Sequence, residues 1–426
     1  MTLETMRQFI DDLWFMRRDI VSDGFDRSLE YISQIIPLKI HKVASGSKCW
    51  TWRVPEKWSV NEAYIEDLHG HRLLDLKNHP LHIMSYSLPI DKVVTREELL
   101  RHLHTRPDRP GAIPFEFKYY ERDWGLCLPH DWLGRFSEER YQVFIDSKFE
   151  HGHLKVGEHT IKGRSRETIA IIAHLCHPAM VNDDLSGVTV LVELAKELAK
   201  RKNHFTYKFV LVPETVGSVA YLSRNEKLIP SLKYGIFLEM LGNDDIHALQ
   251  LSRQGDTAID RAARHVMKGA GQKFRLGGFR EIVKNDEMVW NGPGVNIPTI
   301  SVSRAKPGFP HYPEYHTSDD DPSIISMERL EESKNIVLKM LNILERDYAP
   351  KRKFKGPIFL SRYGLWVDWR VNRKLSHALE KIMLNLEGDK SVFEIAEELD
   401  IDFDELLAYI DKFVAKGLAS RRKIVL

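Results

Sequence analysis

Hydrophobic residues follow three different patterns along the chain, and each pattern predicts a different kind of structure. In residues 1–36 they return every three to four positions, which predicts amphipathic helices. In residues 49–149 short alternating runs such as HIMSYSLPI prevail, among many Trp, Tyr, His and Pro, with a brief helical pattern at Arg96–His104. This second texture predicts a mostly β module with few long helices.

From about residue 153 to residue 348, apolar runs alternate with helical patterns. The run TIAIIAHLC (Thr168–Cys176) is almost entirely apolar, as expected of a strand that is buried on both faces. YKFVLVP, YGIFLEM and TISVS predict further strands, and a long helical pattern at Met327–Arg346 closes the region. This alternation predicts an α/β domain with a mostly parallel sheet flanked by helices.

The last part of the chain predicts a separate small domain. A basic stretch, APKRKFKG (residues 349–356), predicts a linker, and three helical patterns and a terminal strand pair or wing follow it: Leu375–Leu386, Val392–Leu399, Phe403–Lys416 and GLASRRKIVL. We therefore predict an α/β domain at residues 1–45 plus 151–348, an inserted β-rich domain at 46–150 and a winged-helix domain at 357–426.

The predicted winged helix has the wrong charge for reading DNA. Its second helix, DFDELLAYIDKF, carries four acidic residues against the single base Lys412, and an acidic face repels phosphates: Asp402, Asp404, Glu405 and Asp411. We expect a module for protein interaction or oligomerisation. A homo-oligomer is therefore possible, and nucleic acid is not an expected partner.

Composition narrows the class of protein further. Hydrophobic residues make up 43% and charged residues 29% of the 426 positions, and 62 Lys and Arg against 61 Asp and Glu leave a net charge of +1. This is an ordinary globular composition without a charge excess that would drive binding to nucleic acid or anionic membranes. Three widely spaced cysteines, the absence of a signal-peptide pattern and the absence of an apolar run near the ~20 residues of a membrane span predict a cytoplasmic protein with no membrane partner.

Polar residues stand at the ends of four consecutive predicted strands, where open α/β sheets bind their ligands. In chain order they are His174 and His177 with Asp183 and Asp184, then Glu214, Glu239 and His316. Each has an ordinary structural explanation when taken alone, since the two Asp could simply cap the following helix. Imidazoles and carboxylates converging from separate strand ends form a ligand set suited to Zn²⁺, so we predict a metal site.

Other catalytic signatures are absent from the sequence. It contains no HExxH, GxxxxGK[ST], GxSxG or CxxC motif. Cys176 stands beside His177 and could be a nucleophile, but its place in an apolar run favours a buried strand cysteine.

The motifs NDDLSG, PETVG, EMLG and EYHTSDD resemble, in order and spacing, the successive metal-site motifs of the M28 family of zinc aminopeptidases. The resemblance implies the zinc-exopeptidase (phosphorylase/hydrolase-like) fold, with Asp183 as the bridging metal ligand and Glu239 and His316 as further ligands. It also implies that Glu214 is the catalytic base and that Tyr315 helps to polarise the substrate carbonyl.

The resemblance extends over essentially the whole chain. The segments CWTWRVPEKW, SYSLP, YYERDWGLCLP and CHPAMVNDDLSG are similar to those of an M28-related group of bacterial and archaeal proteins, associated with aminopeptidase activity or polysaccharide biosynthesis. Members of that group carry an inserted β-rich domain and a C-terminal winged helix.

Two departures from the family pattern concern the metal. Thr215 stands where the family has a Glu ligand directly after the catalytic Glu, which favours one tightly held zinc ion and a weak second one. HLCHP replaces the usual H-x-D motif. We favour His177 as the ligand because Pro178 ends the strand there, with His174 as the alternative.

These residues predict zinc-dependent hydrolysis of an amide, with an aminopeptidase acting on peptides as the main hypothesis. Glu214 would take a proton from a metal-activated water. Asp286 and Glu287, in VKNDEMVW, either bind the substrate α-ammonium or belong to a solvated loop. One alternative is an N-deacylase or amidohydrolase that acts on an N-acylated small molecule in polysaccharide or secondary-metabolite biosynthesis. The other, motivated by Thr215 and the altered His motif, is a catalytically degenerate scaffold.

Overall fold

The computed structural model describes residues 2–422, which form two compact units. Unit 1 comprises residues 2–255 and 273–334, and unit 2 comprises residues 256–272 and 335–422. Every site residue predicted from the sequence lies in unit 1. Within the described range, no helix has both the length and the apolar composition needed to cross a membrane.

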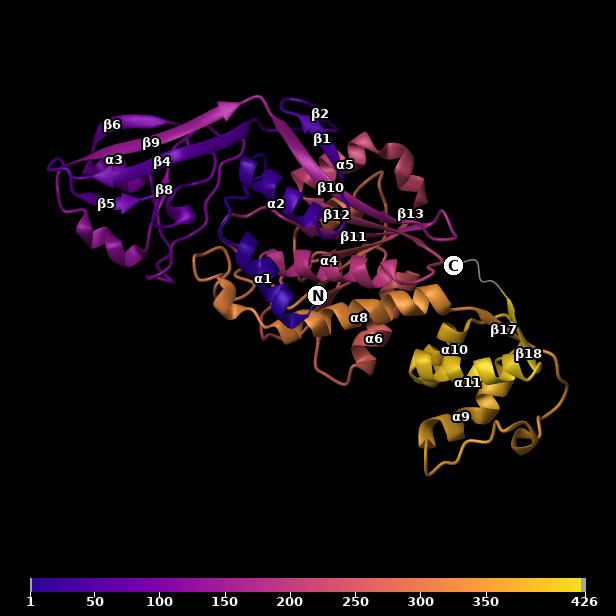
Figure 1. Cartoon of the computed structure of the whole chain (residues 1–426). Coiled ribbons are helices and arrows are strands. Elements are labelled where there is room, and N and C mark those ends of the chain that lie inside the picture. Colours follow the sequence, from indigo (N-terminus) through magenta and orange to yellow (C-terminus); the bar gives the residue numbers. More distant parts are fainter. Residues whose placement is uncertain (1, 423–426) are drawn as a thin grey trace. The chain divides into compact units, whose positions relative to one another are not determined.

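Unit 1 is built on an eight-stranded mixed sheet whose four central strands are parallel (Figure 1). Antiparallel pairing joins β1 to β10, β10 to β12 and β16 to β14, while β14 and β15 are parallel. This arrangement confirms the predicted α/β class. In spatial order the strands are β1 (Lys39–Ala44), β10 (His153–Ile161), β12 (Thr206–Val212), β11 (Thr168–His174), β13 (Leu232–Leu238), β16 (Thr299–Ser303), β14 (Ala248–Gln250) and β15 (Arg275–Gly277).

The central strand β11 is buried along its whole length, because helices cover the sheet on both faces. Helix α4 (Leu185–Ala199) connects β11 to β12, and α5 (Val216–Arg224) returns in the opposite direction from β12 to β13. Right-handed crossovers that run in opposite directions place their helices on opposite faces. The loops after β11, β12 and β13 therefore meet at one edge of the sheet.

Shorter elements complete the α/β part of unit 1. Helix α1 (Leu3–Leu13) packs against α4. The others are α2 (Asp23–Ser33), α7 (Glu287–Trp290), the 3-10 helices η3 (Glu226–Ser231) and η4 (Pro322–Ile324), and the start of α8 (Met327–Arg346). Strand β11 ends at His174, two residues before the end of the predicted apolar run, and this difference matters for the site.

The segment predicted to be β-rich, residues 46–150, is called here the inserted module. It contains a second, four-stranded antiparallel sheet in the order β5-β4-β9-β6 (Figure 1). Its long strands β4 (Lys57–Glu66) and β9 (Arg140–Glu150) pair almost from end to end. Its remaining elements are β2 (Lys48–Cys49), β3 (Trp52–Arg53), β5 (Arg72–Asp75), η1 (Pro80–His82), β6 (Ile90–Thr95), α3 (Arg96–Arg101), β7 (Leu103–His104), β8 (Leu126–Cys127) and η2 (His130–Arg135).

Unit 2 contains the three predicted C-terminal helices and a two-stranded antiparallel sheet. Part of the predicted linker forms β17, which pairs with the terminal strand β18. Unit 2 also takes in α6, which the sequence places with the α/β domain. The predicted domain boundaries and the winged-helix assignment stay predictions. The elements are α6 (Ala258–Gly269), β17 (Ala349–Arg352), η5 (Leu360–Tyr363), α9 (Arg373–Leu384), α10 (Val392–Leu399), α11 (Phe403–Ala415) and β18 (Ala419–Arg422).

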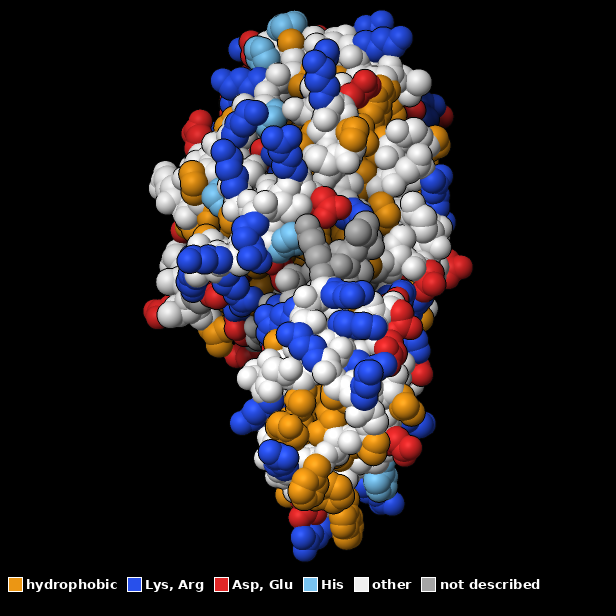
Figure 2. Space-filling model, turned by 90° about the vertical axis from the view of Figure 1, so that its right-hand side faces the viewer, with side chains coloured by type: hydrophobic (Ala, Val, Ile, Leu, Met, Phe, Trp, Pro, Cys, Tyr) orange, Lys and Arg blue, Asp and Glu red, His pale blue; other side chains and the backbone are white. Residues whose placement is uncertain are grey.

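Large apolar side chains stay exposed on unit 2, where Figure 2 shows hydrophobic side chains gathered. Exposed groups of this kind often mark surfaces for other molecules. The predicted role in protein interaction or oligomerisation agrees with this surface and stays a prediction. The side chains are Phe359, Trp366, Trp369, Val371 and Leu384, each at least 59% exposed.

Asp347 gives the stability of unit 2 a testable pH dependence. Burial raises the pKa of its carboxyl to about 6, although the carboxylate accepts a hydrogen bond from the Phe393 N–H at 2.9 Å. The folded state therefore holds the proton more tightly than the unfolded chain, and this contribution to stability is lost as the pH rises through 6. Asp347→Asn keeps the acceptor and should raise the free energy of unfolding at pH 7.5 by up to about 3 kcal/mol. Urea unfolding at pH 4 and pH 7.5 checks this, and an equal difference at both pH values would contradict it.

Candidate metal centre

The loops at the carboxyl ends of β11, β12, β13 and β16 bring the predicted site residues together. His174 is the last residue of β11, His177 and Asp183 lie in the loop that leads to α4, and Glu214 and Glu239 follow β12 and β13. His316 comes from the long loop after β16. These side chains are at least 97% buried except for Glu214 and His316, which are 31% and 20% exposed, so the centre opens to solvent on their side.

Asp183 lies between two imidazoles. Its Oδ1 is 2.9 Å from Nε2 of His174, and its Oδ2 is 3.0 Å from Nε2 of His316. Oε2 of Glu239 lies 3.8 Å from the same Nε2 of His174. One carboxylate that offers its two oxygens to two different histidines has the arrangement of a ligand shared by two cations.

His177 joins the second half of this arrangement. Ligand atoms of His177, Asp183 and His316 all lie within 4.8 Å of one another. Nε2 of His177 also lies 3.4 Å from Oε2 of Glu214. The sequence favoured His177 as the ligand over His174; the structure brings both imidazoles to the centre, with ring centroids 5.0 Å apart.

The ring nitrogens of the two histidines fit a metal ion. Nε2 of His174 and Nε2 of His177 are buried and make no well-aligned hydrogen bond to any residue of the described chain. Orphaned buried nitrogens of this kind are costly unless another partner is bound. Nε2 of His174 and Oδ1 of Asp183 form an ion pair at 2.9 Å, a separation that also fits two ligand atoms of one cation.

The carboxylates of the centre also call for a cation. Among the described residues, Asp183, Glu214 and Glu239 have only histidines as ion-pair partners. Burial and the charge of Asp183 raise the pKa of Glu214 to about 7 and that of Glu239 well above its usual range. A divalent cation would offset this repulsion, and imidazole with carboxylate is a donor set that Zn²⁺ prefers.

Two groups are already in the protonation state that binds metal. Burial alone would raise the pKa of Asp183, but the neighbouring imidazoles of His174 and His316 outweigh it and hold this pKa well below its usual range. Burial and the neighbouring imidazoles hold the pKa of His177 well below its usual range, so its ring is neutral. Metals bind the ionised carboxylate and the neutral imidazole.

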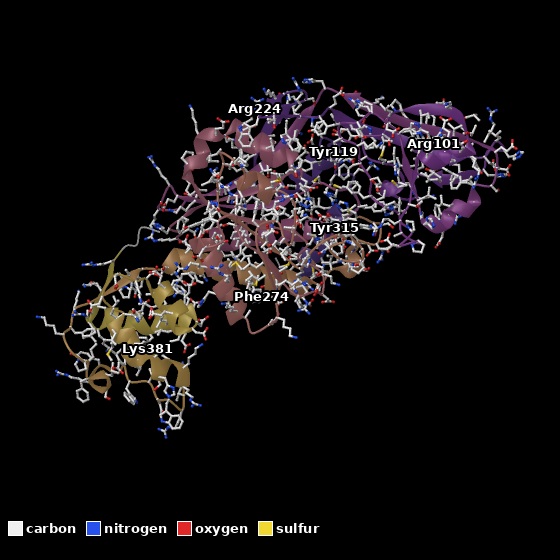
Figure 3. All side chains as sticks on the ribbon, turned by 180° about the vertical axis from the view of Figure 1, so that it is seen from behind. Arg101, Tyr119, Arg224, Phe274, Tyr315 and Lys381 are labelled. Carbon is white, nitrogen blue, oxygen red and sulfur yellow. The ribbon has the colours of Figure 1, made fainter. Side chains whose placement is uncertain are left out.

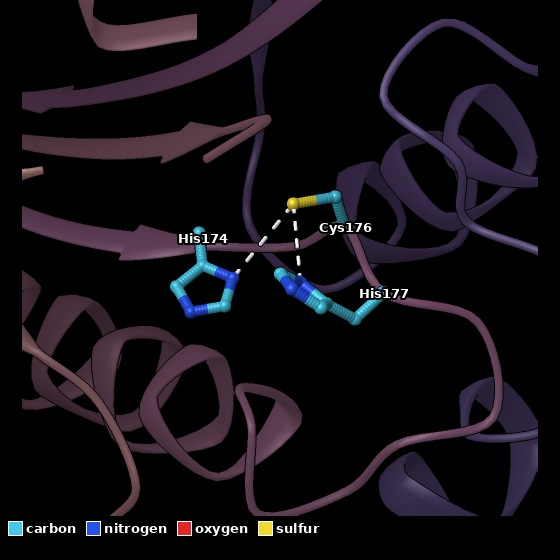
Figure 4. Close-up of side chains that lie close together, drawn as sticks. All are labelled: His174, Cys176 and His177. Atoms are coloured by element: carbon cyan, nitrogen blue, oxygen red, sulfur yellow. Dashed lines mark hydrogen bonds between the residues drawn. The ribbon is translucent and has the colours of Figure 1, made fainter. Parts of the chain in front are cut away.

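Cys176 lies on the Nδ1 side of both histidines (Figure 4). Its Sγ is 3.8 Å from Nδ1 of His174 and 3.4 Å from Nδ1 of His177, and it accepts a hydrogen bond from the Glu214 N–H at 3.1 Å. Burial raises the pKa of the thiol to about 11, so the sulfur is a neutral thiol. It occupies the supporting position that fixes ring orientation at metal sites, two residues after His174, where the resemblance places an Asp.

The loops of the centre contain strained backbone. His177, Thr215, Met240 and His316 all have positive φ, at 85°, 56°, 54° and 55°. Such angles are uncommon for residues with a Cβ and persist only where surrounding contacts impose them. Each of the four site loops contains one of these residues, so each loop is held in a defined shape.

Asp286 and Glu287 lie in the wall behind the centre rather than in a solvated loop, and both are fully buried. The two carboxylate oxygens of Asp286 both accept from the Thr215 N–H at 3.1 Å, which fixes the strained turn next to Glu214. Glu287 accepts from the Asn285 N–H at 2.8 Å, and Asn285 Nδ2 donates to Glu239 at 2.8 Å. This geometry favours a positioning role, while contact with a substrate α-ammonium stays a prediction.

Asp320 is a supporting residue that the sequence did not single out. Its carboxylate accepts from the N–H groups of Asn182 and Asp183 at 2.7 and 3.1 Å and from the Tyr312 hydroxyl at 2.6 Å. It thereby ties the loop that carries Asp183 to the loop that carries His316. The run of three Asp after His316 was the only signal, and it does not distinguish which of them is buried.

Two aromatic rings cover His316. Tyr315, which Figure 3 labels, stacks on its imidazole, with ring centroids 4.0 Å apart and planes at 14°. From the inserted module, Phe115 packs edge-on against His316 at 5.3 Å and against His177 at 4.9 Å. The Phe115 N–H also donates to the His316 carbonyl at 2.9 Å. The inserted module therefore forms one wall of the centre.

Comparison with protein families matches residues 7–347 to a family described as a domain of unknown function, DUF4910. The chain belongs to the DUF4910 family. A relative of this DUF4910 chain in Clostridium acetobutylicum is named "Putative polysaccharide biosynthesis protein with aminopeptidase-like domain". It is 35% identical over 338 residues, which are 79% of this chain and 77% of the relative.

Solved structures extend the comparison. The crystal structure of a "putative peptidase" from Clostridium acetobutylicum is 30% identical, with a TM-score of 0.89 over 99% of this DUF4910 chain and 97% of the other. BSAP, a zinc aminopeptidase from Bacillus subtilis, is 14% identical and gives a TM-score of 0.61 over 80% of this chain and 95% of its own. A peptidase M28 precursor from Shewanella amazonensis gives 0.56 at 14% identity over the same shares. The predicted M28 resemblance is confirmed for the fold, and these likenesses support a peptidase-like hydrolase.

Proposed function

We propose that this DUF4910 protein is a zinc-dependent amide hydrolase that acts as an aminopeptidase. One observation carries the proposal: Asp183 stands between His174 and His316, at 2.9 and 3.0 Å, beside the partly exposed carboxylate of Glu214. A buried ligand set next to a solvent-facing base is what metal-assisted hydrolysis requires.

The proposed ligands are His177, Asp183, Glu239 and His316, to which the geometry adds His174. They divide into two sets that share Asp183. His174 and Glu239 lie on its Oδ1 side and His316 lies on its Oδ2 side, and we group His177 with His316 because their ligand atoms and one of Asp183 lie within 4.8 Å of one another. In this division His177 takes the place of the Glu ligand that Thr215 replaces. We therefore propose two zinc ions per chain and not one.

Zinc at this centre would supply Lewis-acid polarisation of the amide carbonyl and a water of lowered pKa. Glu214, whose pKa burial raises to about 7, takes the proton of the attacking water and passes it to the leaving amine. Asp286 holds the turn that carries Glu214 through the Thr215 N–H. The Tyr315 hydroxyl donates to the substrate oxygen as negative charge develops there.

A substrate screen tests the proposal. With zinc supplied, aminoacyl p-nitroanilides should be hydrolysed, whereas N-acetylated amino sugars should not. The reverse result would favour an N-deacylase, which the polysaccharide-biosynthesis name of the relative suggests. No hydrolysis of either class with Zn²⁺, Mn²⁺ or Co²⁺ would contradict both enzymatic functions and favour the scaffold.

His177→Ala tests the division of the ligands. Removing this imidazole leaves only Asp183 and His316 for one of the two ions, so zinc content should fall from two ions to about one per chain. Metal analysis after gel filtration in metal-free buffer measures this. His153→Ala removes an exposed imidazole on β10 and should keep both ions. Two retained ions in His177→Ala would show that His177 is not a ligand.

A further inference from the structure

A row of aromatic rings leads away from the metal centre along the inserted module. It begins at Phe115, which contacts His177 and His316. Phe117 follows at 5.4 Å from Phe115, and Tyr119 stacks on Phe117 at 4.5 Å with planes at 21°. The rings share one side because the segment is extended, and alternate residues of an extended chain point the same way.

The extended conformation of this segment is fixed at both ends. Pro114 forms a β-bridge with Thr317, next to His316, and Phe117 forms one with Ser85. The Lys118 N–H donates to the Ser85 carbonyl at 3.1 Å. The row is therefore anchored to the loop that carries a proposed metal ligand.

The far end of the row forms the wall of a pocket of about 440 Å³, a size typical of sites for small molecules. The polar and aromatic side chains that line the pocket are three tyrosines, three basic residues and one carboxylate: Tyr86, Tyr119, Tyr120, Arg53, Arg122, His151 and Glu56. Tyr119 links the pocket to the centre, because it lines the pocket and its ring stacks on Phe117, which contacts Phe115. Figure 3 shows Tyr119 and Tyr315, the aromatic side chains at the pocket and at the centre.

The pocket has an excess of positive charge. Arg122 is paired with Glu56. Arg53 donates to the Gly46 carbonyl at 3.1 Å, and no carboxylate of residues 2–422 forms an ion pair with its guanidinium. An exposed arginine without an ion-pair partner, at the rim of an aromatic pocket, suits a carboxylate or a phosphate, which its planar fork of donors can bind in bidentate fashion.

Aromatic surface is left uncovered along the row and near the pocket. Phe117 is 41% exposed and Tyr120 is 54% exposed, and Trp52, whose ring meets Tyr120 edge-on at 6.4 Å, is 38% exposed. Large rings usually bury most of their surface, and rings that stay open beside a pocket offer area for stacking against a ligand.

We propose that the aromatic row and this pocket bind the part of the substrate remote from the scissile amide, and that this part ends in an anionic group held by Arg53. The inference rests on the proposed function, because the row begins at the metal centre. Three ring-to-ring steps of 4.5–5.4 Å separate His177 from Tyr119. An extended peptide advances about 3.3 Å per residue, so about four or five residues reach from the centre to the pocket wall at Tyr119.

Binding to zinc-loaded Glu214→Gln protein tests this without turnover. Isothermal titration calorimetry compares tetra-alanine with its C-terminal amide, and Ala-Ala-Ala-phosphoserine amide with Ala-Ala-Ala-serine amide. The anionic member of one pair should bind roughly tenfold more tightly, in line with a charge-assisted hydrogen bond, and the pair that shows the preference identifies carboxylate or phosphate as its source. Arg53→Ala should abolish the preference and Arg53→Lys should keep part of it, whereas Arg140→Ala, at an exposed arginine of β9 outside the pocket, should leave it intact. Phe117→Ala should weaken the binding of both members of the pair by the same factor.

Three results would overturn the inference: equal binding of the anionic and neutral members, no binding of either pair, or a preference that survives Arg53→Ala. Its failure is distinguishable from failure of the proposed function. An Arg53-dependent preference without any hydrolysis by the unmodified enzyme would support the pocket and refute the hydrolase. Hydrolysis without such a preference would support the hydrolase and refute the pocket.

Discussion

Glu214→Gln should lower kcat for an aminoacyl p-nitroanilide by roughly 10²–10⁴-fold, the usual contribution of a general base, while both zinc ions stay bound. The amide has the shape of the carboxylate but cannot take a proton from water. The Glu214 N–H that donates to Cys176 is unaffected, so the loop should keep its conformation. Steady-state kinetics and metal analysis of the same sample measure the two effects.

A matched control separates the effect of losing the base Glu214 from the effect of losing a negative charge elsewhere on the protein. Glu139→Gln changes an exposed glutamate of the inserted module and should leave kcat unchanged. Unchanged turnover in Glu214→Gln would remove Glu214 from the mechanism. A loss of turnover that is accompanied by a loss of zinc would make it a ligand instead of a base.

Asp183→Asn should have the larger effect, because it acts on both ions together. The carboxylate approaches His174 and His316 at 2.9 and 3.0 Å through different oxygens, and Asn replaces one oxygen by a donor and removes the charge. We expect zinc content below one ion per chain and a loss of kcat on the order of 10³-fold or more, as when the activation of a nucleophilic water is removed. Metal analysis and kinetics on the purified variant measure this.

The neighbouring Asp184 provides the control for Asp183→Asn. Its Oδ1 accepts from the N–H groups of Gly187 and Met240 at 2.9 and 3.1 Å, and burial raises its pKa well above its usual range. Asn mimics a protonated carboxyl and keeps the acceptor, so Asp184→Asn should retain both ions. Two bound ions in Asp183→Asn would contradict the assignment of Asp183 as the shared ligand.

The sequence was sufficient for the fold and for the convergence of the site because both depend on local patterns. The apolar run at Thr168–Cys176 has the length and texture of a strand buried on both faces, and the motifs after each strand place Asp183, Glu214 and Glu239 at one edge of a parallel sheet. Strand ends must meet there whatever the details of the loops. These positions needed no knowledge of long-range packing.

The remaining features depend on contacts that the sequence does not reveal. Pro178 suggested where the strand ends, but β11 ends at His174, and a turn with φ of 85° at His177 brings the second imidazole back toward the first. Asp286 becomes buried because it caps the Thr215 N–H, 71 residues away. Phe115 reaches the centre from the inserted module. Spacing along the chain reports none of these distances.

Unit 2 illustrates the same limit for domain organisation. The three C-terminal helical patterns predicted α9, α10 and α11 closely. No sequence pattern indicates that part of the linker forms β17. Nor does any pattern indicate that α6, about 80 residues earlier, belongs to this compact unit, where Arg261 pairs with Glu397. Both depend on partners that are far away in sequence.

Metal content per chain, in protein purified without chelators and without added metal, tests the central claim most directly. The two ligand sets on either side of Asp183 predict two zinc ions per chain, removable by a chelator and restored by zinc. Protein that contains no bound metal and takes up none on reconstitution would leave Glu214 without an activated water. That result would contradict the hydrolase and favour a scaffold with the fold of a peptidase.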